Sequence, residues 1–378
     1  RAGSAPRRAR RVVLACSIAT ATLVSVSLSG LDTAATASPG CTLPSSVSAA
    51  PDTTLQSQFS AYADAATGTS WTGGDGPHST TLPDGRTLWF FDDTFLGTVS
   101  AKGLRNRAKA PILRNSIVLQ DPTGSLEQTL YQTVGTKPAA YVSPAALKRA
   151  TLGYWPNSLE VVGNELYVLM TEYSFKQNAF SFVRLGDFLA EFDLPSLTLH
   201  AMTALPASPI QWTQWVLHDG SSMYAYGYAN GNAYVAQVDP TTLSEPWLFY
   251  DGSGWSPDAT QAAPIGSAAE GFSVTKQGDA YVLVSLTAST AVGNSIVVSY
   301  SCSATGPFGP SQPVYNTPDH AQYPATWNVI TYDAHVQPAI DAGPDSLVIS
   351  YDVNAPGSKR ALAVAALYRP RYVTLTFG

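Results

Sequence analysis

The feature that most constrains the fold is a strand–turn–strand unit that recurs along the sequence. In each unit, a strand that opens on polar residues meets a tight turn, such as Pro83-Asp84-Gly85 or Gly163-Asn164, and then a strand rich in Tyr, Val and Leu. The sequence shows no sustained amphipathic helical pattern, and its 29 Gly and 27 Pro disfavour long helices. The units cover residues 78–93, 157–172, 214–228, 270–287 and 335–354.

The units recur about every 60 residues, which is long enough for four strands each. A repeat of this length made of four strands is typical of a β-propeller blade. The sequence therefore predicts an all-β protein with a five-bladed β-propeller over residues 38–378, and a β-sandwich is the alternative. In a propeller, the loops that lead into the innermost strands meet at one mouth of a central channel. Polar residues of different units are therefore expected to converge there.

The first 37 residues have the plan of a signal peptide. They open with five Arg, continue with the apolar residues 12–28, and end in the small residues 34–37 before Ser38. The pair Arg10-Arg11 weakly matches a twin-arginine export signal. We therefore expect a secreted, extracellular protein whose mature part is residues 38–378.

Two cysteines, Cys41 and Cys302, remain when residues 1–37 are set aside. In an oxidising compartment, two cysteines most simply form one disulfide bond. This bond would join the start of the predicted propeller to a position far along the chain. A metal site formed by this pair alone is not expected.

Charge and motifs exclude several classes of function. The formal net charge is −6, and five of the 21 basic residues lie in residues 1–37, so the remainder is still more acidic and lacks the clustered Lys and Arg that bind nucleic acid. No later stretch is long and apolar enough to span a membrane. The sequence also lacks the motifs of serine hydrolases, zinc proteases, nucleotide enzymes and sialidases. We expect a monomer without cofactor, metal, nucleic-acid or membrane partner.

Carboxylates dominate the positions that are predicted to converge. Hydrolysis of a glycosidic bond requires one protonated carboxyl group at the leaving oxygen and one ionised carboxylate as nucleophile or base. Asp75 lies in a glycine-rich turn, Asp93 follows an apolar strand, and Glu270 leads into the fourth unit. We predict Asp75, Asp93 and Glu270 as catalytic residues. The alternative is that Asp75 only forms a turn and that Glu270 is a solvated strand end.

Other residues at the same mouth are expected to bind sugar. Trp rings stack on flat sugar faces, and carboxamides hydrogen-bond to hydroxyl groups. His335 has two interpretations, as a ligand in the channel or as a core histidine with satisfied hydrogen bonds. The predicted substrate-binding residues are Asp92, Asn115, Trp155, Asn157, Gln214, His335 and Asn354.

Residues 70–97 resemble the first blade of a known family. They begin Ser-Trp-Thr-Gly-Gly-Asp-Gly-Pro and end Phe-Phe-Asp-Asp-Thr-Phe-Leu-Gly. The family comprises secreted actinobacterial propellers termed domain of unknown function 4185, and it includes endo-D-arabinanases of glycoside hydrolase family 183. The likeness continues in residues 114–116, 239–243, 304–308, 332–335 and 349–354.

The resemblance implies roles for individual residues. The family's two catalytic aspartates match Asp75 and Asp93. The family usually has Gly-Asp-Thr where this chain has Asp92-Asp93-Thr94, which leaves open which of the two carboxylates is used. The chain is also similar to five-bladed arabinanases and xylosidases, whose acid often lies in a Glu-Gly-Pro motif, and Glu270-Gly271-Phe272 is a near match.

Residues and resemblance together predict a secreted glycoside hydrolase. The expected substrate is a furanose-rich polysaccharide, above all the D-arabinan of actinobacterial cell walls. One alternative is a propeller that binds carbohydrate or protein without catalysis. Another is a glycosidase of the same fold that acts on L-arabinan, xylan or a fructan.

Overall fold

A computed structural model describes residues 41–106, 109–144, 151–175, 181–287 and 292–378. All of these residues belong to the unit Ala37–Gly378. The predicted signal peptide, residues 1–37, lies outside the described residues. The following account therefore concerns the predicted propeller alone.

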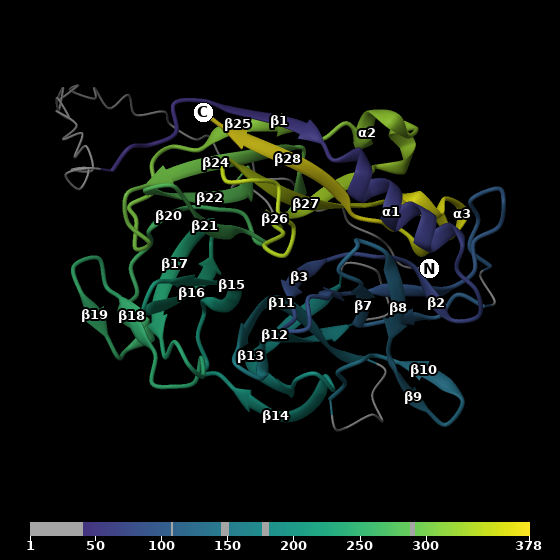
Figure 1. Ribbon diagram of the computed structural model, residues 1–378, viewed down its shortest axis with the longest axis horizontal. Coiled ribbons are helices and arrows are strands. Elements are labelled where there is room, and N and C mark those ends of the chain that lie inside the picture. Colours follow the sequence, from purple (N-terminus) through teal and green to yellow (C-terminus); the bar gives the residue numbers. More distant parts are fainter. Residues whose placement is uncertain (1–40, 107–108, 145–150, 176–180, 288–291) are drawn as a thin grey trace, which may run out of the picture. The chain divides into compact units, whose positions relative to one another are not determined.

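The first two predicted units form the first two sheets (Figure 1). Sheet one has the strand order β3 (His78–Thr81), β4 (Thr87–Phe91), β7 (Ser116–Gln120) and β8 (Leu126–Leu130). Sheet two has the strand order β11 (Leu152–Val162), β12 (Glu165–Phe175), β13 (Phe182–Asp193) and β14 (Thr198–Ala204). Within each sheet, successive strands are antiparallel neighbours.

The next two units form sheets three and four in the same way. Sheet three contains β15 (Gln211–Asp219), β16 (Ser222–Ala229), β17 (Asn232–Val238), β18 (Leu248–Tyr250) and β19 (Trp255–Ser256), with β20 (Gly266–Ser267) paired to β17. Sheet four contains β21 (Ser273–Gln277), β22 (Ala280–Leu286), β24 (Ser295–Ser301) and β25 (Gln312–Asn316).

Sheet five combines β1, from the start of the described chain, with strands from its last part. Its order is β1 (Val47–Pro51), β28 (Arg371–Phe377), β27 (Ser346–Asn354), β26 (Ile330–Val336) and β23 (Val292–Gly293). β1 pairs antiparallel with β28, and Figure 1 shows the purple and yellow strands side by side. This pairing links the segment before the first sheet to the last strand of the fifth.

Shorter elements connect and flank these sheets. A small sheet contains β2 (Ser70–Gly74), β5 (Thr94–Gly97) and β6 (Ile112–Leu113), and a separate hairpin contains β9 (Gln132–Val134) and β10 (Lys137–Ala139). The helices are α1 (Thr53–Asp64), α2 (Asp319–Gln322), α3 (Ser358–Ala363), η1 (Ala259–Gln261), η2 (Ala325–Trp327) and η3 (Ala365–Tyr368). In the part of the chain that the structure describes, none of these helices has the length and apolarity needed to cross a membrane.

Helix α1 packs between sheets five and one. Asp52 caps its N-terminus, because the side chain accepts a hydrogen bond from the Leu55 amide at 2.9 Å. Leu55, Phe59 and Ala63 follow a four-residue spacing and are buried. The Phe59 ring lies 5.0 Å from that of Trp89 in sheet one. The helix therefore fills the space where the two sheets meet.

Apolar clusters lie between consecutive sheets. Leu88 and Val168 belong to the cluster between sheets one and two, and Leu189 and Val216 to the cluster between sheets two and three. One cluster joins sheets three, four and five, and another joins sheet five to sheet one. Because each sheet buries both faces against two neighbours, the arrangement is a ring and excludes the two-layer sandwich. The prediction of an all-β, five-bladed propeller is confirmed.

The innermost strands are β3, β11, β15, β21 and β26. β3 contacts β11, β11 contacts β15, β15 contacts β21, and β21 contacts β26. The stacked rings of His78 and His335 join β26 back to β3. Each predicted strand–turn–strand unit supplies the first two strands of one sheet. The segments that lead into the inner strands are therefore brought to one place although they are distant in sequence.

The predicted disulfide between Cys41 and Cys302 is confirmed. The Cα atoms lie 5.8 Å apart, and the bond spans 261 residues. It joins the segment before β1 to the turn that follows β24. A cross-link across so long a loop stabilises the fold mainly by restricting the unfolded chain.

We expect Cys302→Ser to lower the free energy of unfolding by about 2–5 kcal/mol. Chemical denaturation of the purified protein would measure this loss. Cys41→Ser and the double variant should lose the same amount as the single variant, because each removes the same cross-link. A wild-type protein whose denaturation midpoint does not change under a strong reductant would contradict this prediction.

Candidate active site

A cavity of about 530 Å³ lies where the inner strands begin. Its walls come from the β2–β3 and β4–β5 connections, from β11 and β12, from the segment before β21, and from β26 and the end of β27. Seven of the ten predicted catalytic and binding residues line it: Asp75, Asp92, Asp93, Trp155, Asn157, Glu270 and Asn354.

Backbone hydrogen bonds tie Asp75 to the Asp92-Asp93 pair. The Asp75 amide donates to the Asp93 carbonyl oxygen at 3.3 Å, and the Asp92 amide donates to the Asp75 carbonyl oxygen at 2.8 Å. Gly76 has a φ of 55°, and a Cβ atom there would lie 2.5 Å from Asp92 Oδ2. Only glycine therefore fits between the two acidic segments. This local pairing brings the first two predicted catalytic carboxyl groups to the same wall.

Asp75 is held by two tyrosines. The hydroxyl groups of Tyr332 and Tyr368 each donate to its Oδ2 atom at 2.6 Å. Burial and the nearby Asp93 raise the pKa of Asp75 to about 7, even though the two tyrosine hydrogen bonds lower it. Asp75 therefore keeps its proton up to nearly neutral pH, as a proton donor must.

Asp93 has partners that favour its ionised form. Arg114 Nη1 donates to Oδ2 at 2.7 Å, and Trp155 Nε1 donates to Oδ1 at 3.1 Å. The guanidinium of Arg114 also lies over the Phe175 ring, 3.7 Å from its centroid. Burial raises the pKa of Asp93, and the charge of Arg114 and the two hydrogen bonds oppose that rise. The pKa values of both aspartates are therefore raised, but Asp93 has a cationic partner in Arg114, whereas Asp75 is held by neutral hydroxyl groups.

Among the described residues, Asp92 has no cation or indole partner like those of Asp93. Its Oδ1 atom is buried without a hydrogen bond among the described residues, and so is Oδ1 of Asp352. Burial and the neighbouring carboxylates raise the pKa of both groups well above the usual value. Asp352 Oδ2 accepts a hydrogen bond from the Gly76 amide at 2.6 Å. Of the two adjacent acids, Asp93 is therefore the one equipped to act as a carboxylate.

Glu270 also lines the cavity, in a bend just before β21. The Tyr173 hydroxyl donates to its Oε1 atom at 3.5 Å. Burial, and then the charge of Asp333, raise the pKa of Glu270. Glu270 is therefore a second group that can carry a proton into the cavity.

Aromatic rings form another wall of the cavity. The Trp155 ring lies 4.6 Å from Tyr173, 5.2 Å from Phe175 and 4.9 Å from Phe182. All four residues line the cavity. Such a surface beside carboxyl groups suits a sugar, which has apolar ring faces and a polar edge.

Three predicted binding residues lie outside the cavity lining, which corrects the expectation that they contact sugar. Asn115 is fully buried, and its amide bonds to the backbone of Val142 and Tyr154. Gln214 is buried and accepts a hydrogen bond from the Gly271 amide at 2.7 Å. His335 is buried and contacts Asp333, which does line the cavity. Each of them hydrogen-bonds to backbone groups near the cavity, as buried polar side chains usually do.

Sequence reasoning missed several residues of the cavity. Arg114, Tyr332 and Tyr368 bind the two aspartates, and Tyr173 and Asp333 flank Glu270. Tyr332 and Asp333 lie in the stretch 332–335 that carried part of the family resemblance, so that stretch was a usable signal. Tyr368 comes from η3 and had no signal of its own.

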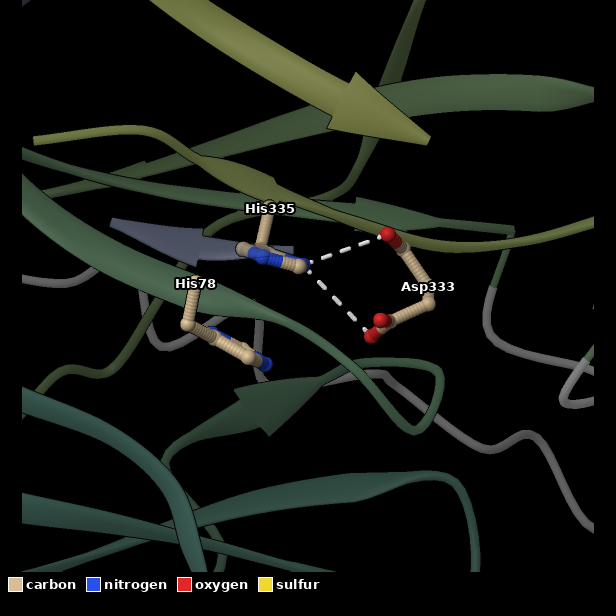
Figure 2. Close-up of side chains that lie close together, drawn as sticks. All are labelled: His78, Asp333 and His335. Carbon is tan, nitrogen blue, oxygen red and sulfur yellow. Dashed lines mark hydrogen bonds and ion pairs between the residues drawn. The ribbon is translucent and has the colours of Figure 1, made fainter. Parts of the chain in front are cut away.

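His78, Asp333 and His335 form a group in which metal-binding atoms lie close together (Figure 2). The two imidazole rings are stacked, with centroids 4.2 Å apart and an angle of 13° between their planes. Lone pairs in parallel ring planes do not converge on one point, so this geometry does not suit a shared metal ion. A second group, formed by Glu165, Asp193 and His200, lies away from the cavity.

The raised pKa of Asp75 predicts a pH dependence of stability. In the unfolded chain this carboxyl group titrates near 3.9, so its stabilising effect is complete below that pH and is lost as pH rises through about 7. We expect wild-type protein to lose on the order of 2–4 kcal/mol more than Asp75→Asn between pH 4 and pH 8. Urea denaturation across this range measures the difference. Parallel curves for the two proteins would show that Asp75 is not protonated in the folded state.

The fold resembles that of solved structures at low sequence identity. A candidate hydrolase from Bacteroides ovatus superposes with a TM-score of 0.72 and 20% identity, over 87% of this chain and 90% of that chain. The exo-β-1,3-galactanase 1,3Gal43A from Clostridium thermocellum gives a TM-score of 0.50 and 11% identity, over 81% of this chain and 61% of that chain. These similarities concern the fold.

No curated protein sequence matches the chain. A family model described as a domain of unknown function, DUF5005, matches residues 56–376. The match is therefore to this family and not to the domain of unknown function 4185 that residues 70–97 resemble. Because the model spans most of the chain, the protein belongs to the DUF5005 family.

Proposed function

We propose that this protein is a secreted glycoside hydrolase that cleaves a furanose-rich polysaccharide, with D-arabinan as the first substrate to test. The observation that carries the proposal is the pair Asp75 and Asp93, two carboxyl groups in one cavity, of which Asp75 has a pKa raised to about 7 and Asp93 is paired with the cation Arg114. Its disulfide fits an oxidising compartment, which supports secretion. The choice of D-arabinan rests on the resemblance of residues 70–97 and is the finer part of the proposal.

In this proposal the reaction divides between the two aspartates. Asp75 donates its proton to the leaving glycosidic oxygen as the bond to the anomeric carbon breaks. Asp93 either accepts a proton from the water that attacks this carbon or attacks it directly as a carboxylate. Glu270, which also lines the cavity, is the second available acid. Tyr332 and Tyr368 keep the Asp75 carboxyl group in place through their hydrogen bonds.

The aromatic wall supports a sugar as the substrate. Trp155, Phe175 and Phe182 offer ring faces on which a sugar can stack, and Asn157 and Asn354 offer amide groups for its hydroxyls. The Trp155 indole also hydrogen-bonds to Asp93, so a sugar stacked on Trp155 would lie beside the proposed base. Exo-β-1,3-galactanase activity of a protein with a similar fold makes galactan a further substrate to include.

We expect Asp75→Asn and Asp93→Asn each to lower kcat/KM on D-arabinan by about 10²–10⁴-fold, because each removes one half of the acid–base pair. The release of reducing ends from D-arabinan, L-arabinan, xylan, levan and β-1,3-galactan would be measured for each variant. Glu270→Gln, assayed beside them, shows whether the second acid is also required.

Glu127→Gln is the matched control, since Glu127 is an exposed acid on β8, away from the cavity. It should keep full activity. If Asp75→Asn and Asp93→Asn also keep full activity, the assignment of the site is wrong. If wild-type protein binds a glycan but releases no reducing ends from any of these polymers, the binding propeller replaces the hydrolase.

A further inference from the structure

Asp333 occupies an irregular position in β26. The pairing of β26 with β27 shifts between Tyr332 and His335, and Asp333 adopts a φ of 56° within this bulge. A bulge redirects a side chain out of the regular alternation of a strand. Asp333 lines the cavity, whereas His335, two residues later, is buried beneath it.

His335 lies against Asp333 and forms an ion pair with it when the imidazole is protonated. Its Nδ1 atom lies 3.5 Å from Asp333 Oδ1 and 3.2 Å from the Asp333 carbonyl oxygen, as Figure 2 shows. Its Nε2 atom lies 2.9 Å from the Pro77 carbonyl oxygen. Nε2 also lies 3.1 Å from Gln337 Nε2, which itself donates to the Pro77 carbonyl oxygen at 2.6 Å. The imidazole is thus held on both sides, with Nδ1 facing Asp333.

The charges around His335 and Asp333 favour this ion pair. Burial lowers the pKa of His335, but the Asp333 carboxylate raises it overall. The same attraction lowers the pKa of Asp333 although burial opposes it. Burial and the charge of His335 lower the pKa of the stacked His78 ring well below its usual value, so His78 is neutral. The upward shift of the His335 pKa and the downward shift of the Asp333 pKa favour an ion pair between them, beside a neutral His78 ring.

The Asp333 carboxylate rests against the backbone next to Glu270. Gly271 has a φ of 75°, and a Cβ atom there would lie 2.0 Å from Asp333 Oδ1 and 2.9 Å from Asp333 Cα. A side chain at Gly271 would therefore displace Asp333. This close approach places the Asp333 carboxylate next to Gly271, in the segment that leads into β21.

We propose that Asp333, anchored by His335, is a positioning residue that acts on Glu270 across Gly271. It sets the protonation state in which Glu270 meets the substrate. This proposal rests on the proposed hydrolase function and extends it to a residue that acts through one of the acids. Its geometric basis is the contact with Gly271, the ion pair with His335 and the bulge in β26.

The electrostatics of Glu270 support the proposal. After burial, the charge of Asp333 is the main influence that raises the pKa of Glu270. Tyr173 from β12 and Arg184 from β13 oppose it. Asp333 also raises the pKa of Asp75 and Asp92, which face the cavity from the first sheet. Asp333 is therefore a common source of negative charge for the acids of the cavity.

Asp333→Asn tests the proposal directly. Asn tolerates the left-handed backbone of this position nearly as well as Asp and has the same shape, so the variant mainly removes the charge. We expect the titration midpoint of Glu270 to fall by about one pH unit or more. Carbon-13 NMR of side-chain-labelled glutamate would measure it, with Glu270→Gln used to assign the signal. A folded Asp333→Asn protein with an unchanged Glu270 midpoint would overturn the proposal.

Gly271→Ala provides a second variant with a matched control. It should also lower the Glu270 midpoint, because the new Cβ displaces Asp333. Gly278→Ala introduces the same kind of backbone strain at a φ of 59° but meets nothing within 4 Å, so it should leave the midpoint unchanged. Equal effects of the two alanine variants would attribute the shift to backbone strain and overturn the proposal.

Activity separates this proposal from the proposed function. If wild-type protein cleaves no glycan, the hydrolase proposal fails, while the titration of Glu270 still decides whether Asp333 acts on it. If it cleaves one, the alkaline limb of kcat/KM, which the proposed function assigns to Asp75, should move to lower pH in Asp333→Asn, because Asp333 raises the pKa of Asp75 as well as that of Glu270. A limb that stays in place while the midpoint moves would show that Asp333 does not influence the reaction.

Discussion

The pairing of β1 with β28 is the constraint on which the remaining structure depends. Every sheet is apolar on both faces and needs two neighbours, and five sheets meet this need only when the last packs against the first. β1 completes the fifth sheet, and α1 fills the junction with the first. Closure also creates the cavity, because Asp75 near the first sheet meets Tyr332 and Tyr368, which lie 257 and 293 residues later.

The same closure gathers carboxyl groups where water is scarce, and ionised groups in such a place strongly disfavour one another. The chain resolves this conflict in different ways at different acids. Arg114 and Trp155 stabilise the charge of Asp93, and His335 stabilises that of Asp333. Asp75 instead has its pKa raised to about 7. Burial raises the pKa of all these acids, but only some of them have a cationic or hydrogen-bonding partner that opposes the rise. Neighbouring acids therefore differ in how easily they ionise.

The sequence was sufficient to predict the blades, the disulfide and four of the five acids that line the cavity. The turns define the hairpins, and a propeller brings the starts of the inner strands together, so Asp75, Asp93 and Glu270 could be assigned to one cavity. The partners of these acids could not be predicted. Asp333 lies where β26 changes register, and a one-residue shift decides which face a side chain meets. Tyr368 reaches Asp75 from a short helical turn that no repeat foreshadowed.

Irregular backbone at the cavity also bears on function. Propellers host many unrelated activities, so membership of the DUF5005 family and likeness of fold leave the chemistry to be argued from the site. A regular β26 would serve the fold at least as well as one with a bulge and a non-glycine residue at positive φ, a conformation that is disfavoured for most residues. The bulge brings Asp333 against Gly271, and burial of His335 anchors it there. In the proposed role both features serve the cavity, because together they hold a negative charge next to Glu270.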